Sequence, residues 1–565
     1  MKHIQLSRAQ ESRGAIERIY VAMRHLFIRG YYKPSGASGQ SLIDELIALR
    51  PEIYGSIDDP TKVELDGLAY VIDRLPKGIE ETRFIKLVSE EGYEQANFKK
   101  IIPAARRRNC YRIDKEQMFI EVTRGKSEIY DILTHLTFLY IQAEKIMRQS
   151  LNEKGQPLRE WKKLEEIVLN GGTHDPEAEE VAFTYLSTIL GRTYEETRTA
   201  HHRFQKNEGH NNGLFHIVYW LGKLAIDETF NDEPRHISFS PALRTRIGHH
   251  IYGERWANRI KQYLHENGLM DREIHIISAN LHSVMNSLYF KEALGGGYKK
   301  LSLLDGIQEL TRDKNRPLGD KILHYALDHG MHMIRENTGT NIAVQIFDTD
   351  KIDLKQLPEE IKGDLKGLKS RKPVIVVMDY AFGEQAFETM DELLKPYKHP
   401  SLEKPHCMNV HSISVMGKAG ILYGGKGDIM IPSSHIFEGT ADNYPFDNDF
   451  SKEDFADIED LNTYEGSMIT VLGTSLQNKD ILEYFKESSW NSVGLEMEGA
   501  HYQKAIQGAS RIRTNIRKDV IVRYAYYASD NPLETGSTLA SGSLGNMGVK
   551  PTYVITQKIL EKILK

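Results

Sequence analysis

The stretch GLEMEGAHYQ, residues 494–503, places two carboxylates around a methionine, directly before a run of small residues. The preceding residues, SVGL, read as the end of a buried strand, and the following residues repeat apolar side chains at helical spacing. The stretch therefore predicts a strand-to-helix junction. Ligands of open α/β sheets bind at the carboxyl ends of strands, so Glu496, Met497 and Glu498 are predicted to face a binding cleft.

Short β-branched runs alternate with helical patterns throughout the C-terminal half of the chain. The runs include EIHIISA, KPVIVVMDY, NVHSISVMG and DVIVRYAYYAS, and GEQAFETMDELLKPY is one of the helical patterns between them. This alternation predicts an α/β domain over residues 272–565 with a central, mostly parallel mixed sheet that is covered on both faces.

The N-terminal half carries a different pattern. SLIDELIAL and EEVAFTYLSTIL repeat apolar residues at intervals of three and four, and no strong strand alternation precedes about Ile274. Residues 1–235 are therefore predicted to form an all-α domain of unknown role. Residues 236–271 are predicted to form a connecting helical segment, in which one helix ends at Gly268.

Length, charge and cysteine content exclude several classes of protein. The 565 residues exceed what one core usually holds, and the net charge of −6 favours neither nucleic acid nor an anionic membrane. Two distant cysteines and no run of about 18 apolar residues predict a cytoplasmic protein without disulfides or membrane spans. The spacing of His201, His202, His210 and His216 matches no recognised ligand pattern, so no metal site is predicted.

Two further strand ends carry polar residues. Gly417–Gly420 reads as a turn in which two glycines allow close backbone approach and Lys418 can meet an anion. Ser529 and Asp530 follow the run DVIVRYAYYA. Carboxylates are thus predicted at two strand ends and a cation at a third.

Three motifs in this half resemble the nucleoside phosphorylase and nucleosidase superfamily, and within it they are most similar to the AMP nucleosidases. They stand in the same order and spacing as in that family: VMGKAGILYGGKGDIMIPSSHIFEGTADNYP, VGLEMEGAHYQKAI and YASDNPLETG. FGEQAFETMDELL fits the glycine turn and helix that precede them in the family. The resemblance covers about residues 274–565 and implies a nucleoside-phosphorylase-like three-layer core and cleavage of a purine N-glycosidic bond.

The resemblance also implies roles for single residues. Asp530 is the expected general acid at purine N7, and Glu498 the carboxylate that holds the ribose hydroxyls and stabilises the cationic sugar. Met497 is expected beneath the sugar. The other expected substrate-binding residues are Glu496, Lys418, Gly417, Gly420, Ser529, Gly383, Glu438, Thr440 and Leu476.

The residues alone leave plainer interpretations open. Asp530 before Asn-Pro can initiate a turn, and Glu498 can be an acid that the dipole of a helix favours in its first turn. Lys418 can be a solvated loop residue, and Met497 can be an ordinary core residue. The glycine-rich residues 536–548 can be an active-site lid or a surface loop.

Departures from the family separate the candidate reactions. The stretch after the first strand, HIISANLHSVMNSL, offers His282 and Ser283 where methylthioadenosine-type nucleosidases carry an acidic residue, so the group that activates water is unassigned. HSISVMGKAG lacks the phosphate-binding arginine of the phosphorylases, which favours hydrolysis over phosphorolysis. SSHIFEGT and TSLQN lack the arginines of AMP nucleosidases, so the sequence does not decide whether the substrate carries a 5'-phosphate.

The leading hypothesis is a purine nucleotide or nucleoside N-ribosyl hydrolase that releases free base and ribose or ribose 5-phosphate. A phosphate-dependent purine nucleoside phosphorylase is one alternative, and a non-catalytic nucleotide sensor with a helical effector module is another. No cofactor is expected, although phosphate is open as a ligand or effector. The expected partners are a small purine nucleotide or nucleoside and further copies of the chain.

Overall fold

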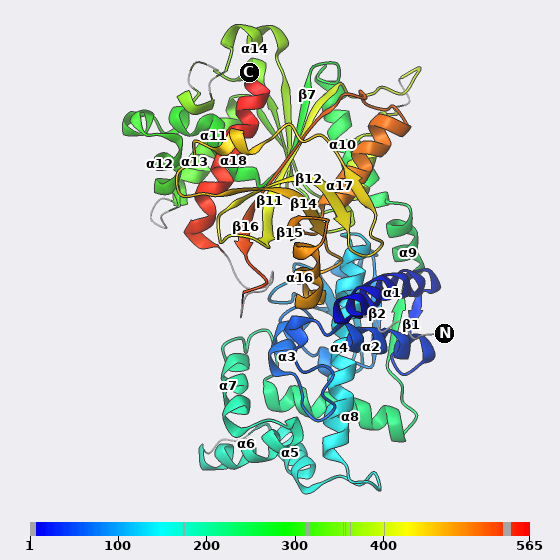
Figure 1. Ribbon diagram of the computed structural model, residues 1–565. Helices are drawn as coiled ribbons and strands as arrows, with labels where there is room; N and C mark the ends of the chain where they lie inside the picture. The colour runs from blue at the N-terminus through cyan, green and yellow to red at the C-terminus, as the bar shows by residue number, and fades with distance from the viewer. Residues whose placement is uncertain are drawn as a thin grey trace, which may run out of the picture. The chain divides into compact units, whose positions relative to one another are not determined.

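The computed structural model describes residues 7–172, 176–311, 316–353, 355, 357–361, 363–399, 402–534 and 544–565. The chain divides into two compact units. The first contains residues Met1–His249 with Ser475–Ile481, and the second contains His250–Thr474 with Leu482–Lys565 (Figure 1). The predicted division into an N-terminal and a C-terminal part thus has an exception, because a short segment of the C-terminal half belongs to the first unit.

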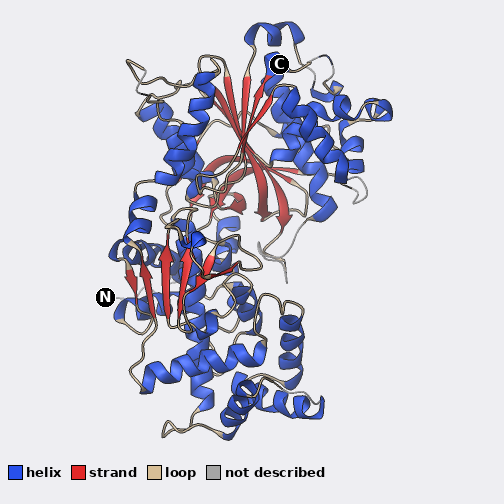
Figure 2. Ribbon diagram, turned by 180° about the vertical axis from the view of Figure 1, so that it is seen from behind, coloured by secondary structure: helices blue, strands red, loops and turns tan. Residues whose placement is uncertain are grey.

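The first unit combines helices with a six-stranded sheet (Figure 2). Its helices are α1 (Arg8–Arg29), α2 (Ala37–Leu49), α3 (Leu65–Ile72), α4 (Lys126–Ser150), α5 (Arg159–Leu169), α6 (Pro176–Leu190), α7 (Tyr194–Gln205), α8 (Leu214–Phe230) and α9 (Pro241–Gly248). The strands, in their order across the sheet, are β1 (Tyr31–Tyr32), β6 (His236–Phe239), β2 (Phe84–Val88), β5 (Gln117–Glu121), β4 (Cys110–Arg112) and β3 (Lys99–Ile101).

The prediction of an all-α N-terminal domain is therefore wrong. The longest strands, β2 and β5, have five residues each, and β5 alternates between partly exposed and buried side chains as a half-buried strand does. The alternation is too short to stand out beside the long helical repeats. The sheet also depends on pairing between distant segments, such as Tyr31 with Ser238, which no local pattern reports.

The prediction of a connecting helical segment over residues 236–271 is also wrong. This segment begins with β6, which pairs with β2 inside the first unit. The single predicted helix is interrupted at His249 and His250, where His250 has a φ of +55°. The second part, α10 (Ile251–Glu266), belongs to the second unit, so the boundary between the units lies within the predicted connector.

The second unit is a three-layer α/β structure, as predicted. Its strands are β7 (Ile274–Ser278), β8 (Met331–Ile334), β9 (Val344–Asp348), β10 (Val374–Met378), β11 (Val410–Ile421), β12 (Ile429–Phe437), β13 (Asn443–Pro445), β14 (Thr463–Thr470), β15 (Ser492–Glu496) and β16 (Ile521–Asp530). Besides α10, its helices are α11 (Leu281–Leu294), α12 (Leu303–Leu310), α13 (Arg316–Asp328), α14 (Leu365–Arg371), α15 (Gln385–Leu393), α17 (Gly499–Gln507) and α18 (Val549–Leu564). Helix α16 (Lys479–Glu487) begins in the segment that belongs to the first unit.

Part of the sheet in the second unit closes on itself. β11 pairs with β16 in parallel and with β15 in antiparallel orientation, β16 pairs with β12, and β14 joins β12 to β15. These pairings form a ring. β7, β10, β9 and β8 extend from β11 as an open wing. Among the described strands of this sheet five pairs are parallel and five are antiparallel, so the prediction of a mostly parallel sheet is wrong.

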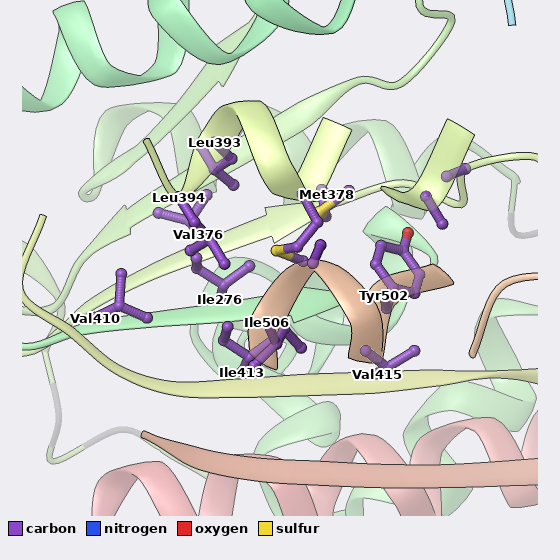
Figure 3. Close-up of a cluster of buried hydrophobic side chains, with 14 of the residues drawn as sticks. Ile276, Val376, Met378, Leu393, Leu394, Val410, Ile413, Val415, Tyr502 and Ile506 are labelled. Atoms are coloured by element: carbon purple, nitrogen blue, oxygen red, sulfur yellow. The ribbon is translucent and has the colours of Figure 1, made fainter. Parts of the chain in front are cut away.

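Apolar side chains cover both faces of this sheet. One cluster joins α10, α15 and α17 to the strands, and Figure 3 shows Tyr502 and Ile506 of α17 with Ile413 and Val415 of β11 in that cluster. A second cluster joins α11, α12, α13 and α18 to the opposite face. The packing of α17 on β11 fixes the start of the helix, where Glu498 lies.

In the part of the chain that the structure describes, no helix has the length and apolar character needed to cross a membrane.

Candidate active site

A cavity of about 260 Å³ lies in the second unit where β11, β15 and β16 meet. Its walls are mostly aromatic and aliphatic, with a few polar groups at the ends of strands. The lining residues are Ser278, Tyr380, Ala381, Val415, Met416, Gly417, Lys418, Ala419, Thr474, Leu495, Glu496, Met497, Glu498, Tyr502, Tyr526, Tyr527 and Ser529. The cavity is suited to a small organic ligand, because such sites combine apolar walls with a few placed polar groups.

Glu496 anchors the junction between β15 and α17. Its side chain is buried, and its carboxylate accepts hydrogen bonds from the backbone N–H of Glu498, at 2.5 Å, and of Gly499. Thr470 donates its hydroxyl to the other oxygen at 2.5 Å. Burial raises the pKa of Glu496 to about 7. With its oxygens occupied by these donors, Glu496 holds the first turn of the helix in place.

Close packing at the same junction requires a glycine. A Cβ on Gly499 would overlap the imidazole of His435 and the carboxylate of Glu496. Ala500 donates its backbone N–H to the hydroxyl of Thr470 at 2.8 Å, which ties the helix to the end of β14. The small residues that follow the two carboxylates in the sequence therefore serve to bring α17 against the strands.

Glu498 lies in the cavity wall at the N-terminus of α17. Its side chain is half-buried, and its Oε1 accepts the backbone N–H of Gly383 at 2.9 Å. Gly383 has a φ of +58°, a conformation that favours glycine. Burial, with a smaller contribution from the charge of Glu496, raises the pKa of Glu498 to about 8. The structure thus brings two predicted site residues, Gly383 and Glu498, into direct contact.

Asp530 ends β16 beside the cavity. Its side chain is 2% exposed, and the Ser529 hydroxyl lies 2.5 Å from its Oδ1 and 3.1 Å from the carbonyl oxygen of Ala419. Because that hydroxyl has one proton, it donates to only one of the two at a time. The Oδ2 of Asp530 is buried without a hydrogen-bond partner among the described residues. Burial raises the pKa of Asp530, although the hydrogen bond from Ser529 and the charges of Lys418 and Lys426 oppose the shift.

The predicted turn at Gly417–Gly420 is wrong, because these residues continue β11. Gly417 and Lys418 pair with Tyr526 and Tyr527 of β16, and a bulge follows between Ala419 and Gly420. The bulge places Gly420 beside Asp530 in the ladder. Lys418 is exposed and lines the cavity, so it remains available to an anion although no turn presents it.

Six predicted residues do not line the cavity: Asp530, Gly383 and Gly420, which lie beside residues that do, and three others. Glu438 is buried and accepts the backbone N–H of Leu472 at 3.3 Å. Thr440 is exposed and donates to Asp442 at 2.7 Å. Leu476 is buried within the first unit. Residues 535–543, which include most of the predicted lid, lie outside the described residues.

Most of the aromatic wall of the cavity is not among the predicted site residues. Tyr526 and Tyr527 stand on the strand that ends at Asp530, and Tyr502 lies four residues after Glu498, on the same face of α17. Helical spacing could have identified Tyr502. Tyr380 follows β10 and Ser278 ends β7, so their positions at strand ends were also available from the sequence.

The group that activates water is not apparent in the wall. His282 is exposed, and Ser283 is buried with its hydroxyl 3.2 Å from the carbonyl oxygen of Asn280. Neither lines the cavity. The charged residues of the described lining are Glu496, Glu498 and Lys418.

Solved structures of nucleoside-cleaving enzymes align with about half of the chain. A 5'-methylthioadenosine/S-adenosyl homocysteine nucleosidase from Campylobacter jejuni is 10% identical, with 52% of this chain and 99% of that chain covered and a TM-score of 0.31. The futalosine hydrolase of Helicobacter pylori is 11% identical, with 52% and 98% covered and a TM-score of 0.29. A methylthioadenosine phosphorylase from an antarctic soil metagenomic library is 10% identical, with 52% and 86% covered and a TM-score of 0.29.

No curated protein matches the chain. One family model matches residues 40–291 and 310–565, which include most of both units, and it describes a family of unknown function. The chain therefore belongs to this family, DUF6909.

Proposed function

We propose that the second unit is a purine nucleoside or nucleotide N-ribosyl hydrolase, which cleaves the N-glycosidic bond to free base and ribose or ribose 5-phosphate. The observation that carries the proposal is the buried carboxyl of Asp530, which does not itself line the cavity but directly follows Ser529, which does. One of its oxygens has no partner among the described residues, and its pKa is raised by burial. A carboxyl in this state can hold a proton and deliver it to a leaving group.

Glu498, which lines the cavity, also supports the proposal. A purine leaves with its bonding electrons, so the sugar develops positive charge, which the ionised form of a nearby carboxyl stabilises. Because the pKa of Glu498 is raised to about 8 in the free protein, this role requires Glu498 to lose its proton in the substrate complex. The hydrogen bond from Gly383 fixes one oxygen of Glu498, and the half-buried side chain can accept the hydroxyls of a ribose. The tyrosines of the wall offer flat apolar surfaces to the base. This chemistry uses side chains and water and needs no cofactor.

The cations of the site favour hydrolysis over phosphorolysis. Lys418 is the one basic residue in the described lining that can contact a phosphate. The described lining contains no arginine, whose guanidinium group could bind phosphate through two hydrogen bonds. A phosphate-dependent phosphorylase therefore remains the second candidate. If the substrate is a nucleotide, the same lysine is the proposed partner of its 5'-phosphate. As in the family that the motifs resemble, the proposed assembly is a homo-oligomer.

The test is chromatographic detection of free base. The purified protein is incubated with AMP, adenosine, inosine and methylthioadenosine, each with and without phosphate, and compared with Asp530→Asn. Asp457→Asn, which changes an exposed acid of the same unit that pairs with Lys558, is the matched control. Base release without phosphate is expected from the parent protein and the control.

Each other outcome would support a different function or contradict the proposal. Release of base only with phosphate, accompanied by ribose 1-phosphate, would show a phosphorylase. Tight binding of a nucleotide with no product would show a sensor that retains the pocket without turnover. Equal rates of base release by Asp530→Asn and the parent protein would show that the carboxyl of Asp530 is not the general acid, and would contradict the proposal.

A further inference from the structure

The first unit contains a second cluster of chemically active side chains. Glu80 and Glu81 lie in the short 3₁₀ helix η2 (Ile79–Glu81), and His216 lies in the first turn of α8. The Nε2 of His216 is 2.7 Å from Oε1 of Glu81 and 3.8 Å from Oε1 of Glu80. One nitrogen and two carboxylate oxygens, one from each residue, all lie within 4.8 Å of one another.

The charges in this cluster are not balanced. Glu80 is 2% exposed, and no lysine or arginine of the described chain lies within 4.0 Å of its carboxylate. Glu81 has such a partner, since Arg112 donates a hydrogen bond to its Oε2 at 2.8 Å. The other oxygen of Glu81, Oε1, faces His216. A buried carboxylate requires a nearby positive charge or a proton, because leaving it ionised and alone costs several kcal/mol.

The local backbone explains why two adjacent carboxylates point to one place. Gly78, with a φ of +88°, turns the chain directly into η2, whose tight turn carries both glutamates. Asn212, near the start of α8, completes the surroundings. Its amide nitrogen is placed 2.7 Å from Oε1 of Glu80 and 3.4 Å from Oε1 of Glu81. Exchange of the amide nitrogen and oxygen would turn a carbonyl oxygen toward the same point.

We propose that Glu80, Glu81 and His216 bind a divalent transition-metal ion. One imidazole nitrogen with carboxylate oxygens is a ligand set that suits Zn²⁺ and Mn²⁺, and the Irving–Williams order makes Zn²⁺ the tighter of the two. Arg112 then acts as an outer partner that orients Glu81. The ion supplies the charge that Glu80 lacks and links η2 to α8, two elements 135 residues apart in sequence.

The rival explanation is a proton. A proton on the carboxyl of Glu80, whose pKa burial raises, would also remove the unpaired charge, and the hydrogen bond between His216 and Glu81 would be unchanged. The two explanations differ in what added metal does: an ion must displace that proton, bind in a ratio of one per chain, and hold the first unit together more strongly.

The experiment uses the full chain, stripped with a chelator and returned to pH 7.5. Zn²⁺ is titrated by calorimetry, and bound metal is counted by elemental analysis after gel filtration. Thermal unfolding is followed with and without Zn²⁺. The expected result is one ion per chain and a rise in the unfolding temperature. Zinc-edge X-ray absorption should show one imidazole among oxygen ligands. Mn²⁺ should bind at the same place more weakly.

The variants separate this site from other histidines on the surface. Glu80→Gln and His216→Gln should each weaken Zn²⁺ binding by more than the 10–100-fold that loss of an outer partner usually costs. His406→Gln removes a histidine that faces a single acid, Asp271, at 2.9 Å, and should leave the affinity unchanged. Glu81→Gln serves as a second ligand variant if Glu80→Gln does not fold.

Three outcomes would overturn the proposal. The first is a parent protein that binds no Zn²⁺ at micromolar concentration. The second is binding with equal affinity in His216→Gln. The third is an absorption spectrum with several imidazoles, which would place the ion at a surface cluster elsewhere.

Discussion

Asp530 and Glu498 are both carboxyls at strand ends, but their surroundings give them different properties. Asp530 is 2% exposed and keeps one oxygen unpartnered among the described residues, whereas Glu498 is half-buried and has one oxygen fixed by the N–H of Gly383. The first arrangement suits a group that holds and delivers a proton, and the second a group that binds and orients. The two proposed roles can therefore be separated by kinetics.

Substitution Asp530→Asn keeps the shape and the hydrogen bond from Ser529 but removes the transferable proton. We expect kcat to fall by about 10²–10⁴, the usual scale of general-acid catalysis, with little change in substrate affinity. Steady-state kinetics over a series of pH values, with Asp457→Asn as the control, measure both quantities. Near-parental kcat at every pH would show that Asp530 is a structural residue at the end of β16.

Substitution Glu498→Gln should affect binding as well as turnover. It weakens the hold on the ribose hydroxyls and the stabilisation of the cationic sugar, so KM should rise and kcat should fall. A 2'-deoxy substrate already lacks part of this interaction, and the variant should therefore lose less with it than with the ribonucleoside. Equal losses for both substrates would place Glu498 away from the 2'-hydroxyl.

The raised pKa of Glu498 also predicts how stability depends on pH. Burial, and then the charge of Glu496, raise the pKa of Glu498 to about 8, whereas in an unfolded chain it is about 4.3. Between these values the folded protein binds more protons than the unfolded chain, so the free energy of unfolding falls as pH rises. Glu498→Gln removes this contribution.

The expected result is a smaller loss of stability between pH 6 and pH 9 in Glu498→Gln than in the parent protein, measured by urea denaturation. Substitution of the exposed Glu487 by Gln is the control. The same pH dependence in Glu498→Gln and the parent protein would mean that the carboxyl is ionised at neutral pH.

At the scale of elements, the junction of β15 and α17 depends on the absence of a side chain at Gly499. A Cβ there would overlap His435, which is buried in the layer beneath. Gly499→Ala should therefore lower the free energy of unfolding by about 1–3 kcal/mol, as overpacking usually does, and should reduce turnover because Glu498 moves with the turn. Gly425→Ala, at a glycine with open space around it, is the control.

A double-mutant cycle tests the cause. If the overlap with His435 is responsible, the cost of Gly499→Ala should shrink when His435 is already replaced by Ser. An unchanged cost would assign the effect to the overlap with the carboxylate of Glu496 or to the backbone of the helix.

Elements that are encoded locally could be predicted, and elements that depend on distant partners could not. β15, β16 and α17 follow from apolar runs and spacing within ten residues or so, so Glu498 and Asp530 could be placed at strand ends from the sequence. The strands of the first unit are too short to show such a pattern, and β1 and β6 pair across most of that unit. Gly417–Gly420 looked like a turn because two glycines suggest one, yet pairing with β16 on one side and β15 on the other keeps the segment extended.

At the scale of the whole molecule, the two units are interleaved in sequence. Residues Ser475–Ile481 leave the second unit and belong to the first. This segment includes Leu476, which the resemblance to the nucleosidases places at the substrate. A motif reports order along the chain, and it carries no information about which unit a loop joins when a second unit is present.

The last prediction concerns this interleaved segment. Asn478 is buried, its amide donates to the carbonyl oxygen of Leu49 at 2.8 Å, and its side-chain oxygen accepts the N–H of Ile481 at 3.1 Å. Asn478→Ala removes these bonds and a longer one, at 3.3 Å, to the carbonyl oxygen of Arg50, and it leaves the buried carbonyl of Leu49 without this donor. Loss of such a helix cap and hydrogen bond costs about 1–2 kcal/mol. We expect the thermal transition of the first unit to shift downward, while that of the second unit changes less.

Differential scanning calorimetry measures the shift, and tryptophan fluorescence assigns it. Variants that keep only Trp161 and Trp220 report the first unit, and variants that keep only Trp256 and Trp490 report the second. Replacement of the exposed Asn170 by Ala is the control within the first unit. A downward shift confined to the second unit would contradict the assignment of residues 475–481 to the first, because the bonds that Asn478 loses would then be stabilising the wrong part of the chain.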